Sequence, residues 1–280
     1  MTDFLETHPR DTDRLAWTRT TRAPVVLLSF DLEEFDLPVE CGQPIPLRRQ
    51  IEAGAEGVAP LLDLLDRLQL PATFFVTAHF AEHRPALVRR IADRHEIASH
   101  SYYHGRFELL DVWRSRDRLQ QLTGEPIDAF RRPRLADTNR HVIQAAGFRY
   151  NSSNNPTWLP GRYNHFRRPR RPFRTGRVWQ LPISTTPRLR LPLFWLSFKH
   201  MPTALLRNAL RSTLEHDGHL NLFFHPWEFI DLTPYRVPWT VRRCAGQAML
   251  DHLEAHLRWL KQHATFVPFT GVERYMTVSG

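Results

Sequence analysis

The chain has 280 residues, which suits one large α/β barrel domain or two small domains, and its two cysteines, Cys41 and Cys244, supply neither a disulfide framework nor a thiolate metal cluster. Its 38 Lys and Arg against 29 Asp and Glu give a net charge of +9, which suits either a solvated basic face or a surface for an anionic partner such as a phosphate or a lipid headgroup. No apolar stretch reaches the length of a transmembrane helix and the first residues do not read as a secretory signal, so we expect a cytoplasmic protein or one at the inner face of the membrane.

Apolar runs of strand length alternate with helical patterns along the chain. In chain order we expect a strand over 25–30 (VVLLSF), a helix over 57–68, a strand over 72–76, a helix over 85–93, a strand over 96–99, a helix over 109–122, a strand over 129–131, a helix over 138–146, a strand over 220–224, a helix over 241–262 and a strand over 265–267. This alternation predicts an α/β fold with a parallel sheet, and continuous apolar strands indicate burial on both faces.

Polar residues follow several of these strands directly. Asp31, Glu33 and Glu34 follow the first strand, His100 and His104 the third, Arg131 the fourth, and His225 the late strand over 220–224. In parallel α/β folds functional groups gather at the carboxyl ends of strands, so we expect these side chains to meet.

The spacing of two of these pairs suits a metal ion. Asp31 and Glu33 are two residues apart at a strand end, so both can point to one side. His100 and His104 are four apart, and on one helical turn they would share a face. One carboxylate and two imidazoles form a common hydrolytic metal site, whereas alone the acidic pair would be a surface turn and the histidine spacing could be chance.

The polar residues at the strand ends could have separate catalytic roles. With two carboxylates at the first strand, one can bind the metal while the other serves as general base, kept ionised by Arg131. Arg131 could instead form a surface salt bridge. His225 could be a hydrogen-bonded core residue or a general acid for an amine leaving group.

The motifs SFDLEEFD, HSYYH, FRRP and FFHP resemble, in order and approximate spacing, those of the polysaccharide deacetylases, carbohydrate esterase family four, which includes chitooligosaccharide deacetylases. The resemblance runs from about residue 25 to 227 or beyond. It implies a distorted (β/α) barrel with fewer than eight regular strands. It also implies an enzyme that removes an acyl group, acetyl in the first instance, from the nitrogen of an amino sugar.

Carried over residue by residue, the resemblance implies a role for each polar side chain. Asp31 corresponds to the catalytic base, Arg131 to the arginine that tunes it, and His225 to the general acid. Glu33, His100 and His104 correspond to the ligands of a divalent metal, Zn²⁺ in the first instance, with Co²⁺, Ni²⁺ or Mn²⁺ as alternatives. Ser101 is expected to hold the shape of the metal loop. The expected substrate-binding residues are Tyr102, Arg134, Trp227, Arg167 and Arg168.

Two departures from the family pattern affect these expectations. Where a family motif has an acidic residue that orients the general-acid histidine, this chain has Asn151, and Glu228 is a candidate substitute. The usual Pro-Tyr-Gly after the third motif is replaced by Pro133-Arg134-Leu135. This replacement puts the backbone contact to the oxyanion in doubt and points to an acidic group on the substrate.

The positive charge is concentrated in one segment. Between Asp137 and Glu215 the chain has no acidic residue and fourteen Arg or Lys. We expect an N-terminal extension over 1–22 and a single catalytic domain over 23–280, with an Arg-rich insertion at about 158–213. Its apolar part, LRLPLFWLSFKHMP, could lie at a membrane interface or be a core helix beside a basic loop. The more specific interpretation is that the substrate is an amino sugar linked to a lipid phosphate or to a nucleotide. It includes peripheral contact of the protein with a membrane, and it excludes nucleic acid as a partner.

Two alternatives remain at this stage. The same scaffold could act on another amide, as a deformylase or a cyclic-amide hydrolase. A non-catalytic carbohydrate-binding module could also keep the fold, although Asp31, His100 and His104 are all present.

Overall fold

The computed structural model describes residues 17–18, 24–159, 163–275 and 277–278. Within the expected N-terminal extension over 1–22, only 17–18 belong to this part; the remainder lies outside the described residues. Strand β1 (Trp17–Thr18) pairs antiparallel with β13 (Thr277–Val278), so the two ends of the described chain meet.

One nine-stranded sheet forms the centre of the fold, in the order β11-β2-β3-β4-β5-β6-β10-β9, with β12 also paired to β2. Its strands are β2 (Val25–Leu32), β3 (Thr73–Val76), β4 (Glu96–Ser99), β5 (Ala129–Phe130), β6 (Tyr150–Asn151), β9 (Phe173–Thr175), β10 (Val178–Gln180), β11 (His219–Phe224) and β12 (Thr265–Phe266). Every pairing is parallel except that of β9 with β10. A separate hairpin joins β7 (Trp158–Leu159) to β8 (Tyr163–Asn164).

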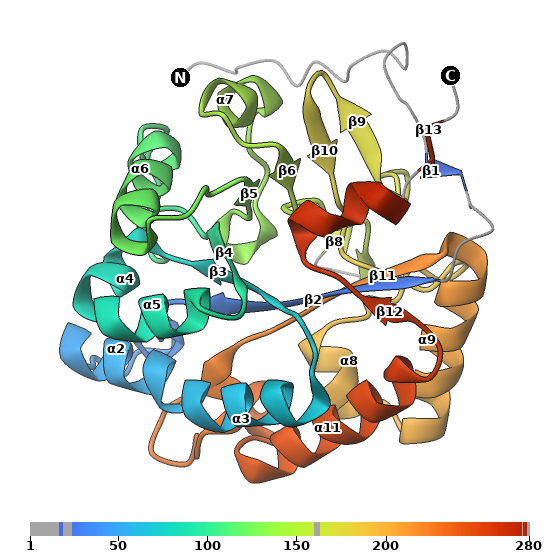
Figure 1. Ribbon diagram of the computed structural model, residues 1–280. Coiled ribbons are helices and arrows are strands. Elements are labelled where there is room, and N and C mark those ends of the chain that lie inside the picture. Colours follow the sequence, from blue (N-terminus) through green and yellow to red (C-terminus); the bar gives the residue numbers. More distant parts are fainter. Residues whose placement is uncertain (1–16, 19–23, 160–162, 276, 279–280) are drawn as a thin grey trace.

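The sheet curls until its two ends approach each other (Figure 1). The segment after β10 reaches β11, where the N–H of Ser184 donates to the carbonyl of Asn221 at 3.1 Å. The result is the distorted (β/α) barrel that the motifs implied, because right-handed twist brings the edges of a parallel sheet round toward closure.

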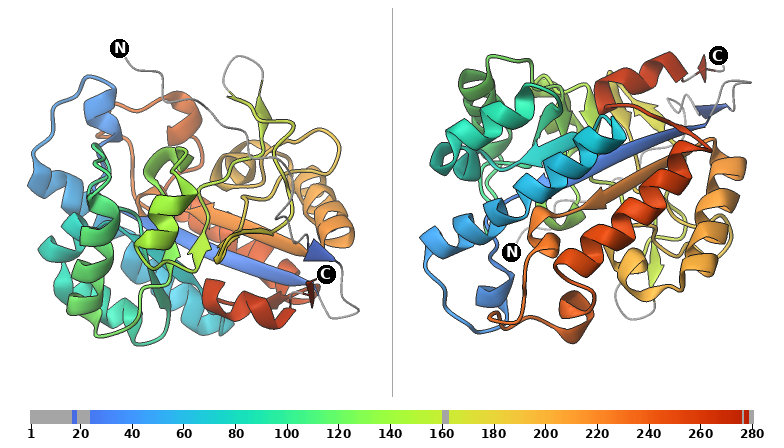
Figure 2. Two further views of the ribbon diagram at one scale, coloured as in Figure 1. Left: turned by 90° about the horizontal axis from the view of Figure 1, so that it is seen from above. Right: turned by 60° about the horizontal axis from the view of Figure 1, so that its bottom comes forward.

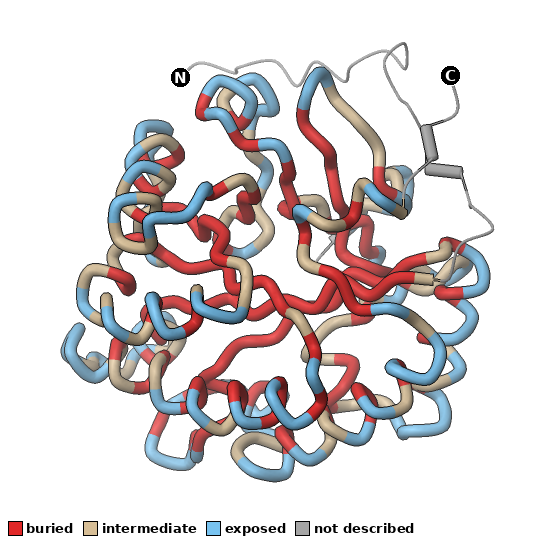
Figure 3. Tube along the Cα trace, in the orientation of Figure 1, coloured by how far each residue is buried: buried red, intermediate tan, exposed pale blue. Residues whose placement is uncertain are grey.

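Helices cover the outer face of this sheet. They are α1 (Leu37–Glu40), α2 (Leu47–Glu56), α3 (Val58–Leu68), α4 (Ala78–His83), α5 (Pro85–Ala92), α6 (Asp111–Thr123), α7 (Arg140–Ala145), α8 (Trp195–His200), α9 (Thr203–Asp217), α10 (Trp239–Arg242) and α11 (Gln247–Lys261), with 3₁₀ turns η1 (Pro133–Leu135), η2 (Pro226–Phe229) and η3 (Phe269–Tyr275). Figure 2 shows α3 and α11 side by side along β2, and Figure 3 shows buried strands inside a shell whose exposed positions lie on outer helical faces. No helix in the described part of the chain has the length and apolarity to cross a membrane.

The alternation of side chains along β2 explains where the polar groups lie. Val26, Leu28, Phe30 and Leu32 belong to the core between sheet and helices, whereas Val25 and Leu27 belong to a second core on the inner face. Successive side chains of a strand point to opposite faces, so Ser29 and Asp31 continue the inner row of Val25 and Leu27. The inner face is therefore apolar at the start of β2 and polar at its carboxyl end.

One expected helix is divided in the structure, and the segment named as an insertion contributes a strand to the main sheet. The helix expected over 241–262 is divided into α10 and α11, because the backbone between them turns through positive φ at Cys244 (φ 52°) and Gly246 (φ 71°). The segment expected as an insertion at about 158–213 is not wholly peripheral, because its strand β10 lies in the main sheet, parallel to β6. Both strands have only two or three residues, too few for a hydrophobic pattern to be read.

Candidate metal centre and cleft

Three side chains from two strand ends converge on one point. Glu33 directly follows β2, and His100 and His104 follow β4. Oε2 of Glu33 lies 3.1 Å from Nε2 of His100 and 3.2 Å from Nε2 of His104. One ligand atom from each of these residues lies within 4.8 Å of the others, so the group could hold a metal ion. The structure thus brings together the three residues that the motifs nominated as ligands.

The two histidines do not lie on a helical turn, as their spacing had suggested. Residues 100–104 form a loop in which Ser101 has φ 67°. The carbonyls of Ser101 and Tyr102 accept hydrogen bonds from the N–H groups of Ala78 and His79 at the start of α4. Backbone bonds therefore hold the loop, and the hydroxyl of Ser101 has no hydrogen-bond partner within the described residues.

The remaining ring nitrogens fix which atoms face the centre. Nδ1 of His100 lies 2.9 Å from the carbonyl oxygen of Arg131, and Nδ1 of His104 lies 2.8 Å from Oδ1 of Asp36. Because these oxygens accept, each Nδ1 carries a proton, which leaves Nε2 of each ring, the atom that faces Oε2 of Glu33, as the one that could ligate a cation. That oxygen is buried and has no hydrogen-bond partner among the described residues. Three acceptor atoms facing one another fit a cation.

Electrostatics at this point also favour positive charge. Burial on its own would lower the pKa of His104, but the carboxylates of Glu33 and Asp36 raise it to about 9. Burial would raise the pKa of Glu33, yet the surrounding imidazoles, His104 foremost, keep it well below its ordinary value. The site therefore keeps a carboxylate ionised in the protein interior and stabilises a cation beside it.

Asp31 lies next to the centre and is paired with a buried arginine. Nη1 of Arg131 donates to Oδ1 of Asp31 at 2.5 Å, and its Nη2 donates to the hydroxyls of Ser29 and Ser152 at 2.9 and 3.1 Å. The guanidinium lies 4.0 Å from the ring centre of Phe75. Oδ2 of Asp31 is 3.9 Å from Nε2 of His100 and remains on the side of the cleft. Arg131 is thus not the surface salt bridge considered as the alternative.

His225 lies near the other carboxylate oxygen of Glu33. Its Nε2 is 4.0 Å from Oε1 of Glu33, and its Nδ1 is 3.0 Å from Oε1 of Glu228. Trp227 stacks on the ring at 4.6 Å and donates its Nε1–H to Glu33 at 3.3 Å. Burial lowers the pKa of His225, but the hydrogen bond to Glu228 and the charge of Glu33 raise it above its ordinary value.

Asn151 does not orient His225. Its amide nitrogen donates to Gln180 at 2.8 Å, and its oxygen accepts from the N–H and hydroxyl of Ser153 at 3.2 and 2.7 Å. Glu228, named from the sequence as a substitute, occupies the position beside the imidazole.

These groups open into a cleft of about 360 Å³. Its polar side contains the centre together with Asp36, Glu40 and Arg134, and its apolar side includes Pro192, Phe194, Trp195, Leu196 and Phe223. Sequence reasoning gave no role to Asp36 within SFDLEEFD, although a carboxylate three residues after Glu33 was a usable signal. It also did not foresee that α8 and the segment before it would form one wall.

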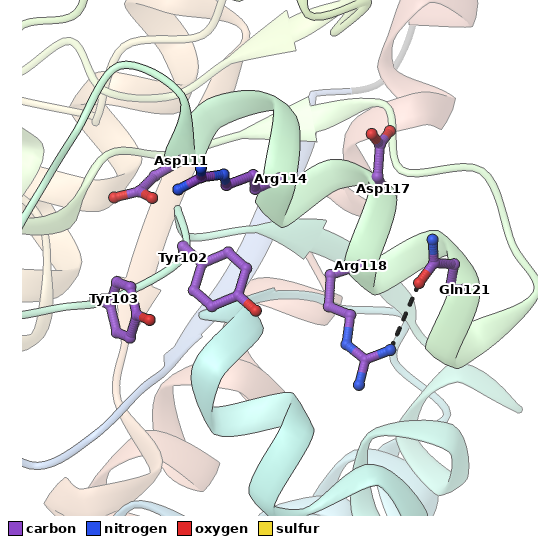
Figure 4. Close-up of a pocket in the computed structure, with 7 residues that line it drawn as sticks. All are labelled: Tyr102, Tyr103, Asp111, Arg114, Asp117, Arg118 and Gln121. Atoms are coloured by element: carbon purple, nitrogen blue, oxygen red, sulfur yellow. Dashed lines mark hydrogen bonds between the residues drawn. The ribbon is translucent and has the colours of Figure 1, made fainter.

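The five expected substrate-binding residues divide into two groups. Arg134 and Trp227 line the cleft, and Arg134 is tethered there by Glu40, Asp36 and the carbonyl of His104. Tyr102 points elsewhere, because it lines a separate hollow of about 410 Å³ against α6 (Figure 4). Its hydroxyl donates to Glu82 at 3.0 Å. Arg167 and Arg168 are not among the residues that line the cleft.

Three arginines of the Arg-rich segment are paired with carboxylates within the fold. Arg168 forms a two-pronged pair with Asp137 at 2.6 Å, and Arg170 and Arg171 both bind the buried carboxylate of Asp217 at 2.6 and 3.1 Å. Arg forks that are already paired with carboxylates do not offer a free phosphate site. Arg168, Arg170 and Arg171 therefore give no support to phosphate binding.

Sequence comparison agrees with this geometry. The family model described as polysaccharide deacetylase matches residues 18–151, which include Asp31, Glu33, His100, His104 and Arg131 but not His225. The matched part, just under half of the chain, is thus similar to the polysaccharide deacetylases. The chitooligosaccharide deacetylase of Sinorhizobium fredii is 35% identical over 36% of this chain, and the peptidoglycan-N-acetylmuramic acid deacetylase PdaA of Bacillus subtilis is 28% identical over 30%. The chain spans about a third of the length of these curated relatives, 35% of each.

Solved structures share the fold over nearly the whole chain. A protein of Mycobacterium smegmatis described as a polysaccharide deacetylase has 21% identity and a TM-score of 0.57, covering 95% of this chain and 97% of its own. The allantoinase PuuE has 16% identity and a TM-score of 0.60, covering 90% and 89%. A family-four pseudoenzyme of Bacillus anthracis has 13% identity and a TM-score of 0.52, covering 90% and 66%. At these identities the likeness concerns the fold.

Proposed function

We propose that this protein is a metal-dependent hydrolase that removes an acyl group from the nitrogen of an amino sugar, with acetyl as the expected acyl group. The observation that carries the proposal is the buried meeting of Glu33, His100 and His104 in a cleft that also contains Asp31 and His225. The match of residues 18–151 to the polysaccharide deacetylase family model supports an acetylated carbohydrate as the substrate class.

Glu33, His100 and His104 would hold the metal, and their nitrogen and oxygen donors suit Zn²⁺, with Co²⁺, Ni²⁺ or Mn²⁺ as alternatives. When bound, such an ion supplies a lowered pKa for water and polarisation of the amide carbonyl. Asp36 and the carbonyl of Arg131 would keep both imidazoles in the ligating tautomer.

The protein's own residues would carry the proton transfers. Oδ2 of Asp31 takes a proton from the attacking water, since Oδ1 is occupied by Arg131. The water oxygen bonds to the carbonyl carbon, and a backbone N–H near Arg134 is the candidate donor to the resulting oxyanion. The C–N bond then breaks, its electron pair stays on nitrogen, and Nε2 of His225 supplies the proton. A carboxylate and a free amino sugar leave.

We further propose that the amino sugar carries an apolar aglycone. Of the two linkages considered from the sequence, lipid phosphate is favoured over nucleotide, because Phe194, Trp195 and Leu196 present an apolar wall beside the centre. Arg134 also lines the cleft, but Glu40 and Asp36 already pair with it, so an acidic group of the substrate would have to displace these partners. We also propose that the protein acts at the cytoplasmic face of the membrane, and cell fractionation would test this location.

The test is product analysis with N,N′,N″-triacetylchitotriose, called chitotriose below, as the probe. We expect acetate and free amine in equal amounts, loss of both after treatment with a chelator, and recovery on adding Zn²⁺. Formate release from N-formyl glucosamine without acetate release from chitotriose would favour a deformylase instead. Binding of chitotriose without any product would favour a carbohydrate-binding module.

A further inference from the structure

A buried row of three ionisable side chains lies behind the cleft. His225 lines the cleft, Glu228 lies behind it in η2, and Lys199 of α8 lies behind Glu228. Nζ of Lys199 is 3.8 Å from Oε2 of Glu228, and both side chains are 0% exposed. Two opposite charges buried together must be compensated by each other, because either one alone would be costly in the interior.

The two carboxylate oxygens of Glu228 have different partners. Oε1 accepts from the backbone N–H of His225 at 2.8 Å and lies 3.0 Å from its Nδ1. Oε2 has no hydrogen-bond partner among the described residues and faces the ammonium of Lys199. Lys199 is itself tied down, since it donates to the carbonyl of Val241 at 2.9 Å. The carboxylate is therefore fixed at both ends.

Two aromatic rings pack against the imidazole. Trp227 stacks on it at 4.6 Å, and Trp195 meets it edge-on at 5.5 Å and 87°. Trp195 belongs to α8, the helix that also carries Lys199. One helix thus supplies a wall of the cleft, a restraint on the ring of His225 and the counter-charge of Glu228.

We infer that Glu228 and Lys199 are positioning residues that hold His225 with Nδ1 turned away and Nε2 directed into the cleft. This role rests on the proposed function, in which Nε2 donates a proton to the nitrogen of the departing amine as the C–N bond breaks. Glu228 sets the ring orientation and Lys199 balances and aims Glu228. Asn151, at the place where a motif carboxylate was expected, takes no part, since it binds Gln180 and Ser153.

A comparison of leaving groups tests the role. Chitotriose loses an amine, which must be protonated, whereas 4-nitrophenyl acetate loses a phenolate that leaves without a proton. The variants are Lys199→Met and the double variant Glu228→Gln/Lys199→Met, which leaves no single charge buried. Because general acid catalysis contributes ~10²- to 10⁴-fold, we expect the ratio of amide to ester kcat to fall at least ~30-fold in the double variant, with KM little changed.

The matched control is Phe198→Leu, the neighbour of Lys199 on α8, whose buried ring packs on Phe224 and His256. It should lower thermal stability and leave the amide-to-ester ratio unchanged. Equal losses on both substrates in the double variant, or an equal ratio change in Phe198→Leu, would reduce Glu228 and Lys199 to a structural role.

A second measurement needs no substrate. In ¹⁵N spectra of histidine-labelled, metal-loaded protein, the His225 resonance, assigned by its loss in His225→Gln, should show the proton on Nδ1, and Glu228→Ala should remove that preference. Failure of the wild type on chitotriose would refute the proposed substrate alone. An Nδ1 of His225 without a proton in the wild type would overturn the positioning role itself.

Discussion

Nδ1 of His104 lies 2.8 Å from Oδ1 of Asp36. This contact turns the opposite nitrogen of the ring toward Glu33, so that a residue outside the proposed ligand set decides how a ligand presents itself. Asp36 lies just before α1, which follows β2, so the same strand end provides the base, one ligand and the support of another.

Asp36→Asn should weaken the metal site without removing a ligand. An amide cannot hold the proton on Nδ1 of His104 as a carboxylate does, and loss of such support typically lowers metal affinity ~10–100-fold. Competition of the purified protein with a zinc-chelating dye measures this affinity. Glu40→Gln is the control, because Glu40 also lies at the cleft and pairs with Arg134 but touches neither imidazole. Equal affinities in wild type and Asp36→Asn would remove Asp36 from the account of the centre.

Asp31→Asn should separate metal binding from turnover. Asp31 is not one of the three proposed ligands, so the variant should retain its ion, while removal of a general base should lower kcat by ~10²- to 10⁴-fold. Glu33→Gln provides the contrast and should lose the ion as well as the activity. Near-normal turnover in Asp31→Asn would remove this residue as the base.

Much of this arrangement was predictable from the sequence, and the reasons are local. Continuous apolar strands showed a parallel sheet, and the rule that polar groups meet at carboxyl strand ends placed Asp31 and Glu33 near His100 and His104. The long-range part was not predictable. The pairing of Arg170 with Asp217, 47 positions away, depends on the path of α9, and no periodicity in the Arg-rich segment reports it. The role of α8 as a cleft wall likewise depends on packing between distant segments.

The paired state of the Arg-rich segment predicts a difference in stability between two aspartates. Asp217 is buried and balances Arg170 and Arg171, so Asp217→Ala leaves those charges uncompensated and should cost on the order of 3 kcal/mol. Asp137 is 68% exposed in its pair with Arg168, and Asp137→Ala should cost less than about 1 kcal/mol. Urea unfolding followed by circular dichroism measures both. Equal destabilisation by the two substitutions would contradict the difference in burial.

His256 predicts a loss of stability in mild acid. Its ring is buried against Phe198, and burial lowers its pKa to about 4 from 6.5. Between these values the unfolded chain binds more protons than the folded one, so the free energy of unfolding should fall as the pH drops from about 6.5 to 4. His256→Gln should show a shallower fall in urea unfolding across this range, whereas exposed His141→Gln should keep the wild-type slope. The same slope in all three proteins would refute the prediction.

The central claim is that Glu33, His100 and His104 bind one divalent cation on which acetate release depends. The most direct measurement is the metal content of the purified protein, by inductively coupled plasma mass spectrometry, alongside acetate release from chitotriose in the same samples. The wild type and surface variant His141→Ala should contain about one ion per chain and release acetate, and His100→Ala and His104→Ala should lose ion and activity together. Full metal content in either ligand variant, or acetate release that persists after the ion is stripped, would contradict it.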